Sequence, residues 1–504
     1  MKFSKKIVTG AMLLIAAPAF AQFTLDAEIR PRFEYRHGFS TVADTASDAA
    51  TFVNQRTRLN FGYKNEGYIF KISVQDIRTW GSQPQTIGTA STQNDDGAYI
   101  AVHEAWGEAL LSENWSIRFG RQEIAYDDHR IFGDLGWAQQ SRAHDAAVIK
   151  FKKSKTLFDL GFAYNQDKGA NFGRDAKFGT YKAMQYLWLN QKFNENFSAS
   201  VLALNLGKEQ LNFDSSGVTP VGYYTDNYAQ TLGTRLLYNK NKLMIAGAFY
   251  YQMGTDADRN NVLRDREGEY NRTVEAMNYR VDLSYNITEK IILSAGYEHL
   301  SGQSQTDTSL AYKRINHSFT PHFGTNHKFN GLMDHFYVGN HINNVGLNDI
   351  FFGLKYKVEK FWVAADAHLF SSPADVWDGY KFNKDLTTAT KALTNATTQA
   401  QMDEATANIK QVNENKYTKY KMDKKFGTEI DFTCGFNLAK GVGVLAGYSV
   451  LIDTETLAYL KGVTYKKGDN AGQGRTDQMN SWGWLMLTFK PKFITGEEKK
   501  PEVK

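Results

Sequence analysis

A regular alternation of apolar and charged residues at positions 23–36 most constrains what this chain can form. In FTLDAEIRPRFEYR, every second residue from Asp26 to Arg36 is ionisable, and the residues between them are apolar or aromatic. Side chains alternate between the two faces of a β-strand, so the segment predicts a strand with one apolar and one charged face. Such a strand fits a soluble sheet, or a membrane barrel with lipid outside and water inside.

The same alternation recurs along the chain and favours the membrane barrel. It is clear at residues 278–285, 352–357 and 429–436, where the last segment places the single Cys434 on the apolar face. Eight tight turns alternate with nine long polar loops, which indicates about 18 strands. Short periplasmic turns, long extracellular loops and an even strand number are typical of bacterial outer-membrane barrels. We therefore predict an all-β fold, a transmembrane antiparallel β-barrel.

The first residues have the pattern of a secretory signal. Lys2, Lys5 and Lys6 precede a short apolar run, and Ala19-Phe20-Ala21 is a small-x-small cleavage site. We expect residues 1–21 to be a signal peptide, residues 22–493 to form the barrel and residues 494–504 to be a charged C-terminal tail. The alternative for residues 1–21 is a structural apolar N-terminus.

Composition limits the kinds of partner and ligand that this protein can bind. Removing the three signal-peptide lysines lowers the formal charge from +5 to 5 − 3 = +2, which argues against a nucleic-acid partner. A single cysteine allows neither an internal disulfide nor a cysteine-based metal cluster. The mean hydropathy of −0.48 is compatible with a barrel, because residues that face the lumen dilute the apolar signal.

Residues 372–425 depart from the strand pattern. The segment is long and contains a stretch rich in Ala, Thr, Gln and Asn, with Leu386, Leu393, Met402 and Ile409 at heptad-like spacing. This spacing predicts a partly helical insertion within one external loop. A low-complexity loop without regular structure is the alternative.

The segment RFGRQEIAYDDHRIFGDLGWAQQSRAHD, residues 118–145, carries the most specific motif. It resembles the signature of the alginate-export (AlgE-like) family of outer-membrane porins, in which a Gly-Arg-Gln strand precedes a loop with Tyr, Arg, Trp and a closing Arg-x-x-Asp. Residues 324–340 look like a loop of Bacteroidota members of that family. The matching motif positions are Gly120, Arg121, Gln122, Tyr126, Arg130, Trp137, Arg142 and Asp145.

The resemblance implies a passive channel in the outer membrane of a Gram-negative bacterium, with an Arg- and Lys-containing lumen for an anionic polysaccharide or oligosaccharide. A guanidinium fork meets a carboxylate bidentately and stays charged, and many weak successive sites let a polymer both enter and leave. On the predicted inner face, the candidate substrate-path residues are Arg30, Arg32, Arg56, Arg58, Lys71, Arg118, Arg235, Arg280, Lys355 and Lys357.

Inner-face carboxylates keep a second interpretation open. Glu28, Glu34, Asp282, Glu298, Glu429 and Asp431 point the same way as the arginines, and charges of both signs often pair across neighbouring strands. The arginines are then wall residues, and the protein is a general or sugar-uptake porin. Arg121 and Glu123 fall on the apolar register, which indicates a bulge or a segment outside the hydrocarbon band.

Other chemistry has little support in the sequence. It contains no HExxH, GxSxG or Walker motif, so we expect no enzyme, no cofactor and no metal site. The acidic runs Asn94-Asp95-Asp96 and Asp127-Asp128 lack EF-hand spacing, and a solvated turn is favoured over loop-bound Ca²⁺. We expect a monomer in outer-membrane lipid, compatible with periplasmic accessory proteins, and the direction of transport is left open.

Overall fold

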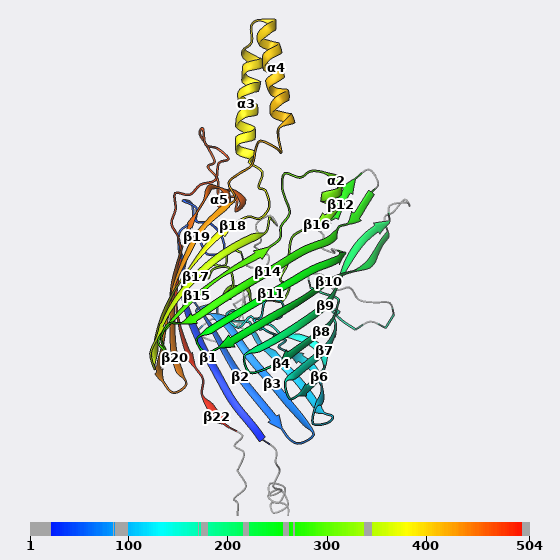
Figure 1. Ribbon diagram of the computed structural model, residues 1–504, viewed down its shortest axis with the longest axis vertical. Coiled ribbons are helices and arrows are strands. Elements are labelled where there is room, and N and C mark those ends of the chain that lie inside the picture. Colours follow the sequence, from blue (N-terminus) through cyan, green and yellow to red (C-terminus); the bar gives the residue numbers. More distant parts are fainter. Residues whose placement is uncertain are drawn as a thin grey trace, which may run out of the picture.

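The computed structural model describes residues 22–83, 85, 99–169, 171–172, 180–214, 221–255, 262–265, 268–336 and 345–495. They form a closed antiparallel barrel of 18 strands (Figure 1), which confirms the predicted fold. The barrel strands are β1 (Gln22–His37), β2 (Ala50–Lys64), β3 (Tyr68–Thr79), β4 (Tyr99–Leu110), β5 (Trp115–Gln122), β6 (His144–Lys153), β7 (Thr156–Tyr164), β8 (Ala183–Lys192), β9 (Phe197–Asp214), β10 (Val221–Lys240), β11 (Leu243–Thr255), β14 (Thr273–Asn286), β15 (Ile291–Leu300), β17 (Leu347–Lys357), β18 (Phe361–Ser371), β19 (Lys425–Ala439), β20 (Val442–Asp453) and β21 (Asn480–Phe489).

The barrel closes because the last strands return to the first. β1 pairs with β2 along one edge and with β21 along the other, where Phe33 is opposite Leu485. The short β22 (Lys492–Ile494) continues the last strand beyond an irregularity, at which the Ala27 N–H donates to the Pro491 carbonyl at 3.0 Å. Closure pairs each of the 18 described barrel strands on both of its edges, as a lipid environment requires.

Eight short connections lie at one end of the barrel and nine long ones at the other, as the sequence predicts. The chain enters β1 and leaves β22 at the end with the short turns (Figure 1). One boundary differs: the polar segment 209–226 is one of the nine predicted loops, but its residues 209–214 and 221–226 continue the β9–β10 ladder, with Glu209 opposite Asp226. A ladder beyond the bilayer needs no apolar face, so polar residues there do not mark the end of a strand.

The two faces of the wall separate apolar from charged side chains. On β1, Ile29 and Phe33 face outwards and are 41% and 44% exposed, whereas Arg30 and Arg32 are only 7% and 4% exposed. Leu283 and Phe432 are likewise exposed apolar residues on the outer face of β14 and β19. The period-two alternation therefore places lipid-facing residues outside and ionisable residues inside.

A helical hairpin stands away from the long-loop end of the barrel (Figure 1). It consists of α3 (Gly379–Asn395) and α4 (Gln399–Glu414), which begin after the capping side chains of Asp378 and Thr398. Ala389 of α3 and Ala405 of α4 are buried. The other long connections contain α2 (Leu310–Lys313), α5 (Glu455–Leu460), η3 (Asn326–Lys328), β16 (Ile315–Asn316) and the hairpin β12 (Val262–Asp265) and β13 (Gly268–Asn271).

Among the described residues, no helix has the length and apolar character needed to cross a membrane. Four segments discussed above lie outside the described residues. They are the expected signal peptide 1–21, the acidic run Asn94-Asp95-Asp96, residues 337–340 of the segment 324–340, and the tail beyond Thr495.

Candidate functional site: two loops inside the barrel lumen

The connection between β5 and β6, residues 123–143, folds back into the barrel, and we call it loop A. Arg30 on β1 donates to the carbonyl oxygens of Gly136 at 2.8 Å and Trp137 at 3.1 Å. Arg56 on β2 donates to the Gln139 carbonyl at 3.2 Å. Because Arg30 and Arg56 project from the inner face of the wall, the loop backbone that they hold lies in the lumen.

Loop A also contacts strands beyond its own hairpin. The Tyr126 hydroxyl donates to the Asp159 carboxylate of β7 at 2.7 Å, and the Tyr126 ring stacks on Trp188 of β8 with centroids 4.5 Å apart. Asp128 forms an ion pair with Arg235 of β10 at 3.2 Å. Loop A therefore reaches from β1 and β2 across the lumen to β7, β8 and β10.

A second connection, residues 301–346 between β15 and β17, joins loop A inside the barrel, and we call it loop B. The Gly133 N–H donates to the Phe323 carbonyl at 2.9 Å, and the Thr325 N–H donates to the His129 carbonyl at 2.9 Å. At its far side the Met333 N–H donates to the Glu429 carboxylate of β19 at 2.7 Å. The two loops together link walls on several sides of the lumen.

Arg130 is the centre of this arrangement. Its side chain is buried, and its Nε lies 2.7 Å from the Glu298 carboxylate of β15. The other guanidinium nitrogens donate to the side-chain oxygens of Asn326 at 3.3 Å and Asn330 at 3.1 Å, both in loop B. One side chain of loop A is thus bound to loop B and to the wall at once.

Backbone conformation in loop A depends on these contacts. Leu135 has φ +54°, a left-handed value that costs a residue with a Cβ about 1 kcal/mol or more. Its N–H donates to the Thr325 hydroxyl at 3.0 Å, which holds this conformation. A Cβ at Gly133 would lie 2.3 Å from the same hydroxyl oxygen, so only glycine allows the close approach of the two loops.

Hydrogen bonds keep Asp134 of loop A ionised. The His129 side chain, the Gly136 N–H and the Thr325 hydroxyl all approach its carboxylate, at 3.4, 3.1 and 3.2 Å. These interactions, with that of His129 the largest, lower the pKa of Asp134 well below its usual value, although burial opposes them.

The Gly-Arg-Gln part of the motif forms the end of β5 that leads into loop A. Gly120 has φ +120°, and a Cβ there would lie 2.2 Å from the Ala105 carbonyl oxygen, so this position requires glycine. Gln122 is buried and donates to the carbonyls of Gly120 at 3.1 Å and Ala146 at 2.9 Å. The motif thereby fixes the angle at which loop A enters the lumen.

The off-register charges near Gln122 have two different explanations. Arg121 faces outwards and pairs with the exposed Asp145 of β6 at 3.1 Å, at the loop end of the wall. Glu123 lies beyond the last residue of β5, so the alternation no longer applies, and it faces His103 inside the barrel at 2.7 Å. The irregularity in strand pairing is in the neighbouring β4, where the residues opposite Ser73 and Val74 of β3 are not consecutive.

Trp137 and Arg142 complete the motif inside loop A. The Trp137 ring contacts the Arg32 guanidinium, which is 4.3 Å from its centroid, and stacks on the His327 ring with centroids 4.4 Å apart. Arg142 donates to the Gly324 carbonyl of loop B at 3.2 Å. The motif identified in the sequence therefore consists largely of loop A, which folds into the lumen, and of residues that contact it.

Most of the ten predicted substrate-path residues contact carboxylates or loop A rather than an open lumen. Arg32 pairs with Glu34 at 2.8 Å, Arg118 with Glu108 at 2.6 Å, and Lys71 with Glu104. Arg56 contacts Glu28 and loop A, Arg58 contacts Gln75 and Glu123, and Arg235 pairs with Asp128. Arg280 pairs with Asp282 and Glu298, and the Lys355 ammonium lies over the Trp362 ring. Arg30 holds loop A, and Lys357 is exposed near the short-turn end.

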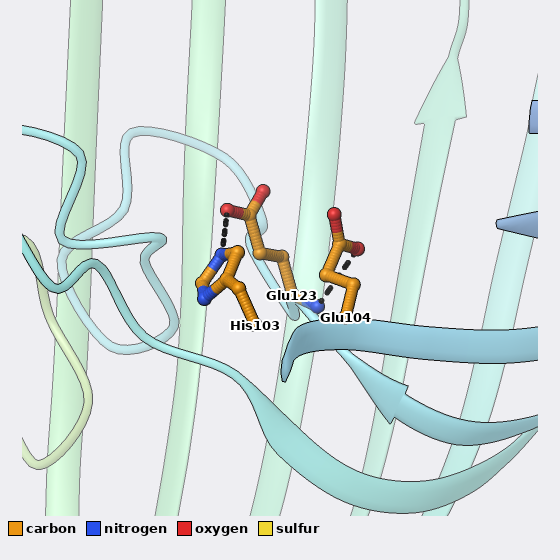
Figure 2. Close-up of side chains that lie close together, drawn as sticks. All are labelled: His103, Glu104 and Glu123. Atoms are coloured by element: carbon orange, nitrogen blue, oxygen red, sulfur yellow. Dashed lines mark hydrogen bonds and ion pairs between the residues drawn. The ribbon is translucent and has the colours of Figure 1, made fainter. Parts of the chain in front are cut away.

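Sequence reasoning missed a cluster of three side chains, His103, Glu104 and Glu123 (Figure 2). The irregularity in β4 turns both His103 and Glu104 inwards, and their ligand atoms and those of Glu123 lie within 4.8 Å of one another. Lys71 already pairs with Glu104, and Arg58 lies 3.7 Å from Glu123, so the two negative charges are balanced. The cluster is therefore better suited to fixing the start of loop A than to holding a divalent cation.

Comparisons with known proteins agree with this architecture. The family model described as "Alginate export" matches residues 21–165, a span that contains the whole motif 118–145. No curated protein sequence matches the chain. The outer membrane protein opdK of Pseudomonas aeruginosa is 10% identical, with 94% of this chain and 99% of that chain covered and a TM-score of 0.51. OccAB4 of Acinetobacter baumannii is 9% identical, with coverages of 94% and 98% and a TM-score of 0.52. These low identities show the shared fold alone.

The closed barrel, its charged lumen and its inward loops define a porin-type channel of the Gram-negative outer membrane, a non-enzymatic protein through which a solute passes. Within that class, residues 21–165 carry the alginate export signature, and the resemblance predicted from the motif is confirmed.

Proposed function

We propose that the protein is a passive channel for an anionic polysaccharide or oligosaccharide. The observation that carries the proposal is a surplus of cations where β1 and β2 meet loop A. Among the described residues, four of five arginines here share three carboxylates, Glu28, Glu34 and Glu123, as ion-pair partners, and the fifth, Arg30, pairs with none. The arginines are Arg30, Arg32, Arg36, Arg56 and Arg58.

Arg30 contributes most to this surplus. Among the described residues, no carboxylate lies within ion-pair distance of its guanidinium, which donates only to loop carbonyls and to Gln139. Hydrogen bonds between a guanidinium and a carboxylate are stronger than those to neutral carbonyls. A uronate carboxylate in the lumen can therefore compete with loop A for Arg30, which couples the passage of an anion to movement of the loop.

An adjoining cavity gives such a ligand room. A volume of about 390 Å³ lies beside loop A and is lined by Arg32, Arg36, Arg78, Phe39 and Trp137 and by one carboxylate, Asp334, among others. Guanidinium groups beside aromatic rings suit carboxylated sugars, because they offer both charged donors and an apolar surface.

A specific observation favours a second candidate, a general or sugar-uptake porin. Away from β1 and β2 several inner-wall charges are paired: Arg118 pairs with Glu108 at 2.6 Å, and Lys150 pairs with Asp159. Arg280 pairs with both Asp282 at 2.7 Å and Glu298 at 3.0 Å. A wall of this kind selects weakly between anions and cations.

Single-channel recording separates the two candidates. The purified protein in planar bilayers is recorded under a salt gradient to obtain the reversal potential, and then titrated with oligomannuronate. Anion selectivity and block by the uronate support the proposal, and Arg30→Gln then weakens the block. Arg118→Gln is the matched control, because that arginine is neutralised by Glu108. A weakly selective pore that is indifferent to uronates favours the general porin.

A further inference from the structure

A cavity of about 640 Å³ lies at the short-turn end of the barrel, on the far side of the lumen from the long loops. It is bounded by the turns 358–360 and 440–441 and by the ends of β18 to β21. Its volume is within the range of about 300–1,000 Å³ that is usual for small-molecule sites. Because short turns face the periplasm in such barrels, this cavity is at the periplasmic entrance.

The cavity lies on the inner face of the wall. Trp362, Gly435 and Leu445 are opposite one another on β18, β19 and β20, and all three line it. The Trp362 ring shares its face with Lys355, whose Nζ is 4.1 Å from the ring centroid. The same face carries the charged residues of the lumen, so a molecule in the cavity is already within the channel.

The lining has an excess of positive charge. It contains three lysines, Lys360, Lys440 and Lys490, and one carboxylate, Glu359, which leaves 3 − 1 = 2 positive charges. Among the described residues, Lys360 and Lys440 have no ion-pair partner within 4 Å, whereas Lys490 is 3.4 Å from Glu28. Unpaired lysines on short turns remain available to an anion that arrives from the periplasm.

Trp362 supplies an aromatic surface beside these lysines. Its indole lies against Gly435, where a Cβ would be 2.3 Å from Nε1, so glycine makes room for the ring. The C–H face of a sugar ring is apolar, while its hydroxyls and carboxylate lie at the rim. An indole next to several ammonium groups therefore matches a uronate in both respects.

We propose that this cavity is a binding subsite for the carboxylated sugars of an anionic saccharide, through which the chain end is first captured at the periplasmic mouth. This inference rests on the proposed function, to which it adds the position of a binding subsite in the channel and the residues that form it. Trp362 packs against the sugar ring, and Lys360 and Lys440 bind its carboxylates. Since the lysines are flexible and solvated, each contact is weak, as a conduit for a polymer requires.

The test uses the full-length channel in planar bilayers, with a size-defined oligomannuronate added to one side at a time. We expect Lys440→Gln and Trp362→Ala each to raise the half-blocking concentration from the turn side by about 3- to 10-fold, the effect of losing one partly solvated charge or ring contact. Block from the loop side changes less than about twofold by the same reasoning. A manno-oligosaccharide of equal length, which lacks carboxylates, blocks far more weakly.

Lys155→Gln is the matched control, because Lys155 lies on the short turn between β6 and β7, at the same rim but outside the cavity. The subsite is overturned if the wild-type channel is blocked by the uronate while Lys440→Gln and Trp362→Ala behave like wild type, or if Lys155→Gln weakens block as much. If the wild-type channel is blocked from neither side, the proposed function itself fails. Trp362→Phe, which keeps an aromatic ring, is expected to retain block and serves if the alanine variant does not fold.

Discussion

Replacing Arg130 by methionine tests whether loop A is held in the lumen by its own side chains. Arg130 is ion-paired with Glu298 at 2.7 Å and bound to Asn326 and Asn330 of loop B. Removing one partner of a buried ion pair costs about 3–5 kcal/mol. Glu298 keeps Arg280 at 3.0 Å, so the remaining carboxylate is not left uncompensated. We therefore expect a loss of about 2–3 kcal/mol in the free energy that holds the loops.

This loss predicts a measurable change in conductance. A loss of about 2–3 kcal/mol raises the population with a displaced loop about 30- to 150-fold. In single-channel recordings the Arg130→Met channel should spend correspondingly more time at higher conductance levels than wild type. The barrel itself should remain folded, as far-UV circular dichroism and heat-modifiable migration on gels can verify, because its ladder does not involve Arg130.

Arg121→Met is the matched control within the same motif. Arg121 pairs with Asp145 on the outer face, where both side chains are well exposed, and such pairs contribute about 0–1 kcal/mol. If Arg130→Met leaves the conductance levels and noise of a folded channel unchanged, or if Arg121→Met changes them equally, loop A is not held as we describe.

Three further predictions concern the loop entry, the helical hairpin and pH. Gly120→Ala should sharply lower the yield of folded barrel on heat-modifiability gels, because its Cβ meets the Ala105 carbonyl oxygen at 2.2 Å, whereas Gly107→Ala, with open space at its Cβ, should fold normally. Replacing residues 383–415 by a short Gly-Ser linker should leave conductance unchanged, since α3 and α4 pack mainly on each other; a changed conductance would assign the hairpin a role in the pore. Because the pKa of Asp134 is lowered in the folded protein, its contribution to holding loop A is fully present above the ordinary pKa of 3.8 and is lost only as pH falls through the lower folded-state value. Channel noise should therefore be the same at about pH 7 and about pH 5, and a rise at pH 5 would contradict the assignment.

Much of the barrel could be predicted from short-range patterns. The alternation at residues 23–36 identifies the inner face of β1, and the rhythm of turns and loops gives the strand number, because both are properties of adjacent residues. The β9–β10 extension was missed because a ladder in water carries no apolar face. His103 was missed because the irregularity that turns it inwards depends on how β4 pairs with β3.

The features of the candidate site likewise divide into those that the sequence predicts and those that depend on the tertiary structure. The sequence by itself determined the closed barrel, the separation of apolar and charged faces, and the positions of the cations, since the bilayer imposes these on any alternating chain. Only the tertiary structure decided what the cations do, because their partners are far away in sequence: Arg30 holds a carbonyl 106 residues distant, and Arg130 joins loop B to β15. A polar loop has the same composition whether it lies in external water or is bound inside the lumen. Its location depends on hydrogen bonds and ion pairs that form only once the barrel has closed around it.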